Sequence, residues 1–321
     1  MRAPRSRRLN AERIFRSPSE GTILLIAKPA AQDGNGAAAA DRAAAALRAQ
    51  LGEDRVVLAR TAGPRHASEI AERAEGCSTV IALGGDGVIH EVAGGLLRRP
   101  LDRRPVLGVV PVGSGNDYAR TLGMSHKVDE ACAQVLAAQA RPVDVGRVND
   151  DWFLETLSFG LDAAIAHDTV DRRVRTGRTG ALLYMESGVD QLLHHLDLYR
   201  YRASFDGGKA VDSQSIMFAV QIGPYYGSGF KICPDALVDD GLLDVCIAHP
   251  PVSVARALYI FMRAKDGKHV GFKQVELRRC RTLRVEFDQA PPAQVDGERL
   301  SGRTFDISVD RGALHVLMPT A

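Results

Sequence analysis

Residues 83–95, LGGDGVIHEVAGG, leave an apolar run through two glycines, an aspartate and a third glycine, and then continue with helical spacing. Glycines lack Cβ atoms, so backbone N–H groups at such a corner can approach a bulky anion, and the positive end of the following helix adds to the attraction. Phosphate suits this corner. A carboxylate beside polyphosphate is repelled unless a divalent cation binds between them or the carboxylate accepts or donates a proton. The alternative for this stretch alone is a tight turn in which Asp86 caps the helix.

A second corner of the same design lies in residues 106–120, VLGVVPVGSGNDYAR. An apolar strand ends at glycines 113 and 115, Ser114 offers a hydroxyl group, and Asn116 and Asp117 open a helix. Corners that follow successive parallel strands face one crevice at the carboxyl edge of the sheet, so the two together favour a nucleotide site. Neither corner is a GxxxxGK[ST] or GxGxxG motif, so the phosphate site is of another type.

Strands and helices alternate around these corners. We expect strands at 21–29, 55–61, 78–83 and 105–112, and helices at 37–51, 66–76, 90–98 and from 117 onward. This alternation predicts an α/β domain whose parallel sheet is covered on both faces. After about residue 144 the segments, including FLETLSFGLDAAIA at 153–166, are typical of an antiparallel β-sandwich, interrupted by helical patches at 182–196 and 252–265.

Three regions follow from this change of pattern. We expect a basic tail (1–19), a nucleotide-binding α/β domain (20–144) and a β-sandwich domain (145–321) that carries substrate, metal and catalytic residues. Whether the last residues return to the first domain stays open.

Composition is that of an ordinary soluble protein: 321 residues, 45% hydrophobic, 25% charged and a net charge of +2. Five scattered cysteines without a CxxC pair indicate neither a disulfide framework nor a zinc site, and they suit a reducing compartment. The longest apolar runs are too short to span a bilayer, and no apolar segment follows the basic N-terminus as in a signal peptide. We therefore expect a cytoplasmic protein.

Positive charge is concentrated in two places. Residues 1–16 carry six arginines against one glutamate, and DRRVRTGRT (171–179) carries Arg172, Arg173, Arg175 and Arg178. These segments are interpreted either as a solvated tail and a charged loop, or as contacts with an anionic membrane surface. Nucleic-acid binding is not expected, because no aromatic residues are interleaved with the arginines.

Six motifs, in order, resemble the diacylglycerol kinase catalytic-domain family, which includes bacterial diacylglycerol and related lipid kinases and the sphingosine kinases. They are GGDGVIHEV (84–92), PVGSGNDYAR (111–120), RPVDVGRV (141–148), SFGLDA (158–163), PDALVDDGLLDV (234–245) and VDGE (295–298). The ordered set is specific, whereas GGDG alone also occurs in NAD kinases and phosphofructokinases.

The resemblance implies ATP-dependent phosphorylation of a lipid hydroxyl, with the nucleotide between the α/β domain and the sandwich. Together with the two corners, it implies ATP binding by Thr61, Gly84, Gly85, Asp86, Gly87, Val88, Ile89, His90, Glu91, Gly113, Ser114, Asn116 and Asp117. It also implies a structural Mg²⁺ held by the Asp240 carboxylate and the carbonyls of Leu237 and Leu242, all hard oxygen donors. From the residues alone, 239–241 is a hairpin turn.

The segment VDGERL (295–300) is, from its residues, an Asp-Gly turn between two strands. The resemblance makes it catalytic, with Glu298 as proton acceptor and Asp296 beside it, near Asp86. Phosphoryl transfer needs an aligned hydroxyl, a metal and a base. We expect Glu298 to be the base and Asp86 to orient metal-bound phosphates, and the choice between Asp296 and Glu298 stays open.

The chain departs from the family after its first strand, where AKPAAQDGNG (27–36) places Lys28 in the position of an asparagine. Lys28 either pairs with phosphate or marks a weak ATP contact. His90 is interpreted as a packing or surface residue rather than a catalyst. The segment YYGSGFKICP (225–234) either lines the acceptor pocket or only connects strands.

These observations predict a Mg²⁺- and ATP-dependent lipid kinase that is cytoplasmic and peripherally bound to anionic membrane. Two alternatives remain: an NAD-kinase-like kinase of a soluble acceptor, and a nucleotide- or lipid-sensing module without turnover. The sequence does not identify the lipid, and a homodimer is left open.

Overall fold

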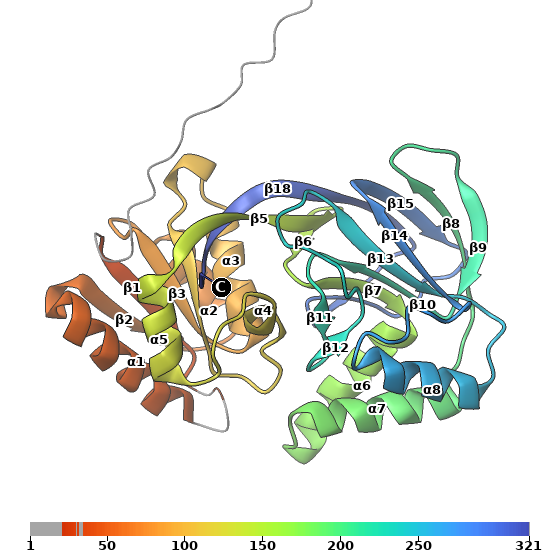
Figure 1. The fold of residues 1–321 in the computed structure, drawn as a ribbon, viewed down its shortest axis with the longest axis horizontal. Helices are drawn as coiled ribbons and strands as arrows, with labels where there is room; N and C mark the ends of the chain where they lie inside the picture. Colours follow the sequence, from red (N-terminus) through yellow and green to blue (C-terminus); the bar gives the residue numbers. More distant parts are fainter. Residues whose placement is uncertain (1–20, 30, 32–34, 321) are drawn as a thin grey trace, which may run out of the picture.

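The computed structural model describes residues 21–29, 31 and 35–320, in which an α/β lobe adjoins a β-sandwich (Figure 1). The basic tail predicted at 1–19 lies outside these residues. Four parallel strands form the α/β lobe in the order β2-β1-β3-β4. They are β1 (Ile23–Ala27), β2 (Val56–Arg60), β3 (Thr79–Gly84) and β4 (Val106–Pro111). Gly84 pairs with Pro111 at the ends of β3 and β4, so the two glycine corners leave the sheet side by side.

Helices cover this parallel sheet. They are α1 (Asn35–Leu51), α2 (His66–Glu72), α3 (Asp86–Leu97), α4 (Asp117–Thr121) and α5 (Val128–Ala137), with short 3₁₀ turns at Glu53–Arg55 and Leu101–Arg103. Helix α1 packs against α5, and α2 packs against α3. Because β3 and β4 are buried at every residue, the helices must cover both faces, which confirms the α/β prediction.

The second half is an antiparallel sandwich, also as predicted. One sheet has the order β14-β13-β10-β7-β16-β17. Its strands are β7 (Thr156–Gly160), β10 (Met217–Gln221), β13 (Leu243–Ala248), β14 (Val275–Cys280), β16 (Ala293–Val295) and β17 (Glu298–Leu300). Facing it are β5 (Gln139–Val148), β6 (Asp151–Phe153), β8 (Tyr199–Phe205), β9 (Val211–Ser215), β15 (Thr282–Phe287) and β18 (Thr304–Met318).

Aromatic side chains join the two sheets of the sandwich. The ring of Phe159 on β7 lies 5.2 Å from that of Phe287 on β15 and 4.6 Å from that of Phe305 on β18, measured between centroids. A separate small hairpin, β11 (Tyr225–Tyr226) and β12 (Phe230–Lys231), carries the turn of the YYGSGFKICP segment.

Strand β18 belongs to both lobes. It pairs antiparallel with β15 and β5 and, near its end, parallel with β4, where Val316 lies opposite Leu107. Figure 1 shows β5 and β18 running together across the top of the molecule from one lobe to the other. Asp144, near which we place the domain boundary, therefore lies inside β5.

The strand predicted through residues 153–166 is wrong in its second half. Strand β7 ends at Gly160, and α6 (Leu161–Thr176) begins at the next residue. Gly160 has φ 80°, a conformation that suits glycine and lets the chain turn directly from strand to helix. Asp162, Ile165 and Thr169 are buried with the spacing of one helical face.

The charged segment 171–179 is likewise not simply a loop, because it contains the last turn of α6 and the link to α7 (Ala181–His194). Helix α7 and helix α8 (Val254–Ala264) correspond to the two predicted helical patches. Among the described residues, no helix combines the length and apolar character needed to cross a bilayer.

Candidate active site

A cleft of about 900 Å³ lies where the two glycine corners of the α/β lobe meet turns of the sandwich. The α/β lobe contributes the starts of α3 and α4, and the sandwich contributes Glu155 and Thr156, the β11–β12 turn, the β16–β17 turn and the end of α6. Of the sequence-predicted site residues, the cleft wall contains Gly85, Asp86, Gly87, Val88, His90, Gly113, Ser114, Asp117, Asp296 and Glu298. Lys28 also lines it.

The glycines at the corners have two different roles. A methyl group on Gly113 would lie 2.4 Å from the Cα atom of Gly85, so here the two corners touch backbone to backbone. A methyl group on Gly87 would meet no atom within 4 Å, so this glycine faces open space. Gly85 and Gly113 hold the corners together, and Gly87 leaves room for a ligand.

Three carboxylates meet at this point. Asp86, Asp117 and Glu155 each bring an oxygen to within 4.8 Å of the others. Asp86 begins α3 and accepts a hydrogen bond from the backbone N–H of Tyr118 (3.2 Å). Asp117 begins α4, forms an ion pair with Arg120 and accepts the N–H of Ser228. Hard carboxylate oxygens grouped in this way fit Mg²⁺.

Burial and mutual repulsion disfavour the charged forms of these acids. Burial, followed by the charge of Asp117, raises the pKa of Asp86 to about 6. Burial also raises the pKa of Glu155 well above its ordinary value, and the charges of Asp86, Asp296 and Asp117 act in the same direction. The Glu155 carboxylate accepts no hydrogen bond from any described residue. The cluster is therefore short of positive charge, which a divalent cation would supply.

Asp296 is held by four donors. Its carboxylate accepts the N–H groups of Leu154 (2.7 Å), Glu155 (3.0 Å) and Thr156 (2.9 Å), and its Oδ2 atom lies 2.9 Å from His90 Nδ1. The side chain is only 2% exposed. Asp296 therefore fixes the segment that carries Glu155, and it links the sandwich to α3.

His90 packs as expected, with its ring stacked on Trp152 at a centroid distance of 3.9 Å, and it also lines the cleft. Burial lowers its pKa, but the hydrogen bond to Asp296 and the charges of Asp296, Glu298 and Asp151 outweigh this effect and leave it raised. Glu298, two residues after Asp296, is exposed at the edge of the cleft.

Other predicted ATP-binding residues lie outside the cleft wall: Thr61, Gly84, Ile89, Glu91 and Asn116. Ile89 is fully buried in the core, and the Glu91 carboxylate accepts the N–H of Ala67 at the start of α2. The Thr61 N–H donates to Ala27 O on β1. Of these residues, Asn116 holds a corner directly, since its side-chain amide donates to Gly113 O (2.8 Å).

The residues predicted to hold a structural Mg²⁺ lie between β12 and β13, and none of them lines the cleft. Asp240 Oδ1 accepts the N–H of Leu242 (3.0 Å), so the turn closes on its own aspartate. The carbonyls of Leu237 and Leu242 accept no hydrogen bond from the described residues. Carbonyl and carboxylate oxygens are the donors that a hard cation such as Mg²⁺ prefers.

Two buried acids were not predicted from the sequence: Glu155, which lines the cleft, and Asp162, which lines an apolar cavity beside it. Glu155 is a charged residue inside an apolar segment, and this position in the sequence could have indicated a functional role. Asp162 is buried, its Oδ1 accepts the hydroxyls of Tyr184 and Tyr226, and its Oδ2 has no partner within the described chain. Asp162 went unnoticed because its segment was interpreted as a strand.

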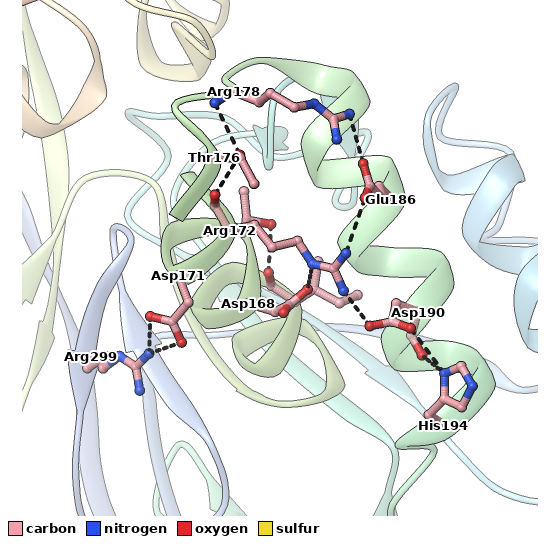
Figure 2. A network of polar contacts seen from close by, with 11 residues as sticks. Asp168, Asp171, Arg172, Thr176, Arg178, Glu186, Asp190, His194 and Arg299 are labelled. Atoms are coloured by element: carbon pink, nitrogen blue, oxygen red, sulfur yellow. Dashed lines mark hydrogen bonds and ion pairs between the residues drawn. The ribbon is translucent and has the colours of Figure 1, made fainter. Parts of the chain in front are cut away.

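Two of the four arginines predicted to contact anionic lipid are engaged within the protein instead (Figure 2). Arg172 is 16% exposed and pairs with Asp168, Glu186 and Asp190. Arg178 pairs with Glu186 (2.8 Å). The lipid-contact prediction therefore does not hold for Arg172, whose guanidinium joins α6 to α7.

A parallel sheet with two glycine corners, facing acids on a β-sandwich, defines a class of phosphate-transferring enzyme. Two family models match the chain, the "Diacylglycerol kinase catalytic domain" over residues 22–148 and the "YegS C-terminal NAD kinase beta sandwich-like domain" over residues 155–318. The chain belongs to the diacylglycerol kinase catalytic-domain family, and it is a kinase.

Similar proteins agree with this assignment. A diacylglycerol kinase of Bacillus subtilis (strain 168) is 31% identical over 75% of this chain and 77% of its own length. A protein of Chromohalobacter salexigens named "Probable lipid kinase YegS-like" is 32% identical over 80% of each chain. A crystal structure of a diacylglycerol kinase from Bacillus anthracis has the same fold, with a TM-score of 0.70 at 20% identity over 93% of this chain and 97% of that one.

Proposed function

We propose that the protein transfers the γ-phosphoryl group of ATP to the hydroxyl of a lipid such as diacylglycerol, with Mg²⁺ as cofactor. The observation that carries this proposal is the meeting of two glycine corners with Asp86, Asp117 and Glu155 in one cleft. Names of related proteins and the two family models point to the same activity.

The corners would bind the phosphates. Gly87 leaves the start of α3 open, Ser114 offers a hydroxyl group, and Lys28 contributes positive charge to a wall that is otherwise rich in acids. The three-acid cluster would hold the Mg²⁺ that accompanies ATP, and Asp240 with the carbonyls of Leu237 and Leu242 would hold a structural Mg²⁺. When bound at the cluster, Mg²⁺ supplies positive charge against the charge that develops on the transferred group.

Glu298 is the proposed proton acceptor for the lipid hydroxyl. It is exposed at the cleft, whereas the Asp296 carboxylate is already occupied by four donors. Geometry therefore favours a positioning role for Asp296 and leaves Glu298 free to receive a proton.

An apolar cavity of about 80 Å³ lies beside this cleft. It lies among α6, α7, α8 and the sandwich, with walls that include Ile165, Phe230 and Phe261. Tyr226 lines both this cavity and the cleft. A cavity of this size admits only a short apolar segment beside the cleft, so the preference for a lipid over a soluble acceptor comes from the related proteins.

The test is to incubate the protein with Mg²⁺, labelled ATP and a total lipid extract, and to identify the labelled product by mass spectrometry. A phosphorylated lipid together with ADP is expected. Label in a water-soluble product would favour the soluble-acceptor alternative, and nucleotide binding without ADP would favour a sensor.

A further inference from the structure

The turn between α6 and α7 carries an unusual pair of exposed side chains. Val174 is 84% exposed and Leu182 is 80% exposed, the two highest values among the large apolar residues that the structure describes. Val174 lies in the last turn of α6 and Leu182 in the first turn of α7, so both belong to one tip. We call residues 173–182 the hairpin tip. Large exposed apolar side chains that gather at one place mark an interaction surface.

Positive charge without a counterion lies beside this apolar pair. Arg173 and Arg175 form no ion pair with any described residue, in contrast to Arg172 and Arg178. The acid before them, Asp171, is already paired with Arg299 (2.8 Å) (Figure 2). The hairpin tip therefore presents aliphatic side chains together with uncompensated cations.

The hairpin tip is anchored at its base and lies at the edge of the cleft. Arg172 joins α6 to α7 through Glu186 and Asp190, as Figure 2 shows, and these ion pairs anchor the base of the tip. Arg173, Gly177 and Gly180 at the tip also line the cleft. Whatever the tip binds therefore lies next to the reaction site.

We propose that the hairpin tip is the membrane-docking element. Val174 and Leu182 enter the bilayer interface, and Arg173 and Arg175 contact anionic headgroups. The inference rests on the proposed function, since a lipid acceptor then passes from the bilayer into the cleft beside the tip. An anionic bilayer offers an apolar interior for the aliphatic side chains of the tip and negatively charged headgroups for its arginines. In a dimer docked tip to tip, Arg173 and Arg175 of one copy would face the same arginines of the other copy, and these like charges would repel.

Vesicle binding of the full chain, without ATP, tests this proposal. Co-sedimentation with phosphatidylcholine vesicles containing about 30% phosphatidylglycerol is compared with pure phosphatidylcholine vesicles. The double variant Val174→Asp/Leu182→Asp should bind the anionic vesicles at least about tenfold more weakly. Arg175→Glu should lower binding to the anionic vesicles by about fivefold or more and leave weak binding to neutral vesicles unchanged.

A matched control is Val211→Asp, which changes a 57% exposed side chain on edge strand β9. It should bind vesicles like the wild type, and an equal loss in this control would overturn the proposal. So would unchanged binding by the double variant, or a change in its oligomeric state on ultracentrifugation with vesicle binding retained.

Turnover provides the second measurement. The double variant should phosphorylate a short-chain, water-dispersed diacylglycerol at the wild-type rate and vesicle-borne diacylglycerol more slowly. Equal loss on both substrates would contradict docking. If the wild type phosphorylates neither lipid, the proposed function fails, whereas the vesicle-binding comparison still decides the role of the tip.

Discussion

Replacement of Asp296 by asparagine tests whether this residue positions the site or acts as the proton acceptor. The Asp296 carboxylate receives three backbone N–H groups and His90, and Leu154, Glu155 and Thr156, which donate them, are all at least nine-tenths buried. An asparagine keeps one acceptor oxygen and turns an amino group toward the remaining donors.

The expected cost follows from that geometry. One buried N–H is left without an acceptor, which costs about 1–3 kcal/mol, and the remaining bonds lose their charge-assisted strength. Asp296→Asn should therefore lower the free energy of unfolding by about 2–4 kcal/mol. Turnover should also fall, because Glu155 and His90 lose their common support.

Urea denaturation followed by circular dichroism measures the first effect, and ADP release at saturating lipid measures the second. Glu298→Gln, two residues further on and exposed, is the matched comparison. Its stability should stay within about 0.5 kcal/mol of the wild type, and its turnover should fall by about a hundredfold to ten thousandfold with ATP affinity nearly unchanged. Wild-type stability of Asp296→Asn would refute the positioning role. A near-normal rate of Glu298→Gln would place the proton acceptor elsewhere.

Three further predictions concern the two lobes. Because burial raises the pKa of Asp86 from 3.8 to about 6, this carboxyl favours the folded state below pH 4, and that contribution is lost as the pH rises through 6. Asp86→Asn should abolish turnover. Its free energy of unfolding, measured by urea denaturation at each pH, should exceed that of the wild type by an amount that grows to about 3 kcal/mol between pH 4 and 7. Gly87→Ala should weaken ATP binding, measured by calorimetry, without lowering the free energy of unfolding. Gly113→Ala should also lower the free energy of unfolding by about 1–3 kcal/mol, because its methyl group would lie 2.4 Å from backbone. Equal stability of the two variants would contradict the packing role of Gly113. Arg172→Ala should lower stability by about 1–3 kcal/mol in low salt and less in high salt, and an effect that is independent of salt would argue against the ion network.

Local patterns were sufficient to predict the fold class. The alternation of buried strands with helices predicted the parallel sheet, because each element shows its own spacing of apolar residues. Helix α6 was missed because Leu161 follows Gly160 with no polar break, so the apolar residues of strand and helix merge into one run. The meeting of Gly85 and Gly113 was also predictable, since adjacent parallel strands end at one edge.

The contacts across the cleft were not predictable from spacing. His90 and Asp296 are 206 residues apart, and their hydrogen bond depends on the β16–β17 turn, where Asp296 has φ 44°. Glu155 lies beside Asp86, and its backbone N–H donates to Asp296 from another part of the chain. Such long-range arrangements are set by how the lobes fit together, and periodicity carries no information about them.

The strand that closes the α/β lobe, β18, is the last of the described strands along the chain. β4 gains its second neighbour only when β18 emerges, since Val316 pairs with Leu107 from 209 residues earlier in the chain. While the ribosome makes the intervening sandwich, the edge of the nascent parallel sheet stays open to wrong partners. Nucleotide binding by this lobe should therefore appear late in translation, and truncation before residue 304 should yield an aggregation-prone chain rather than an independent half.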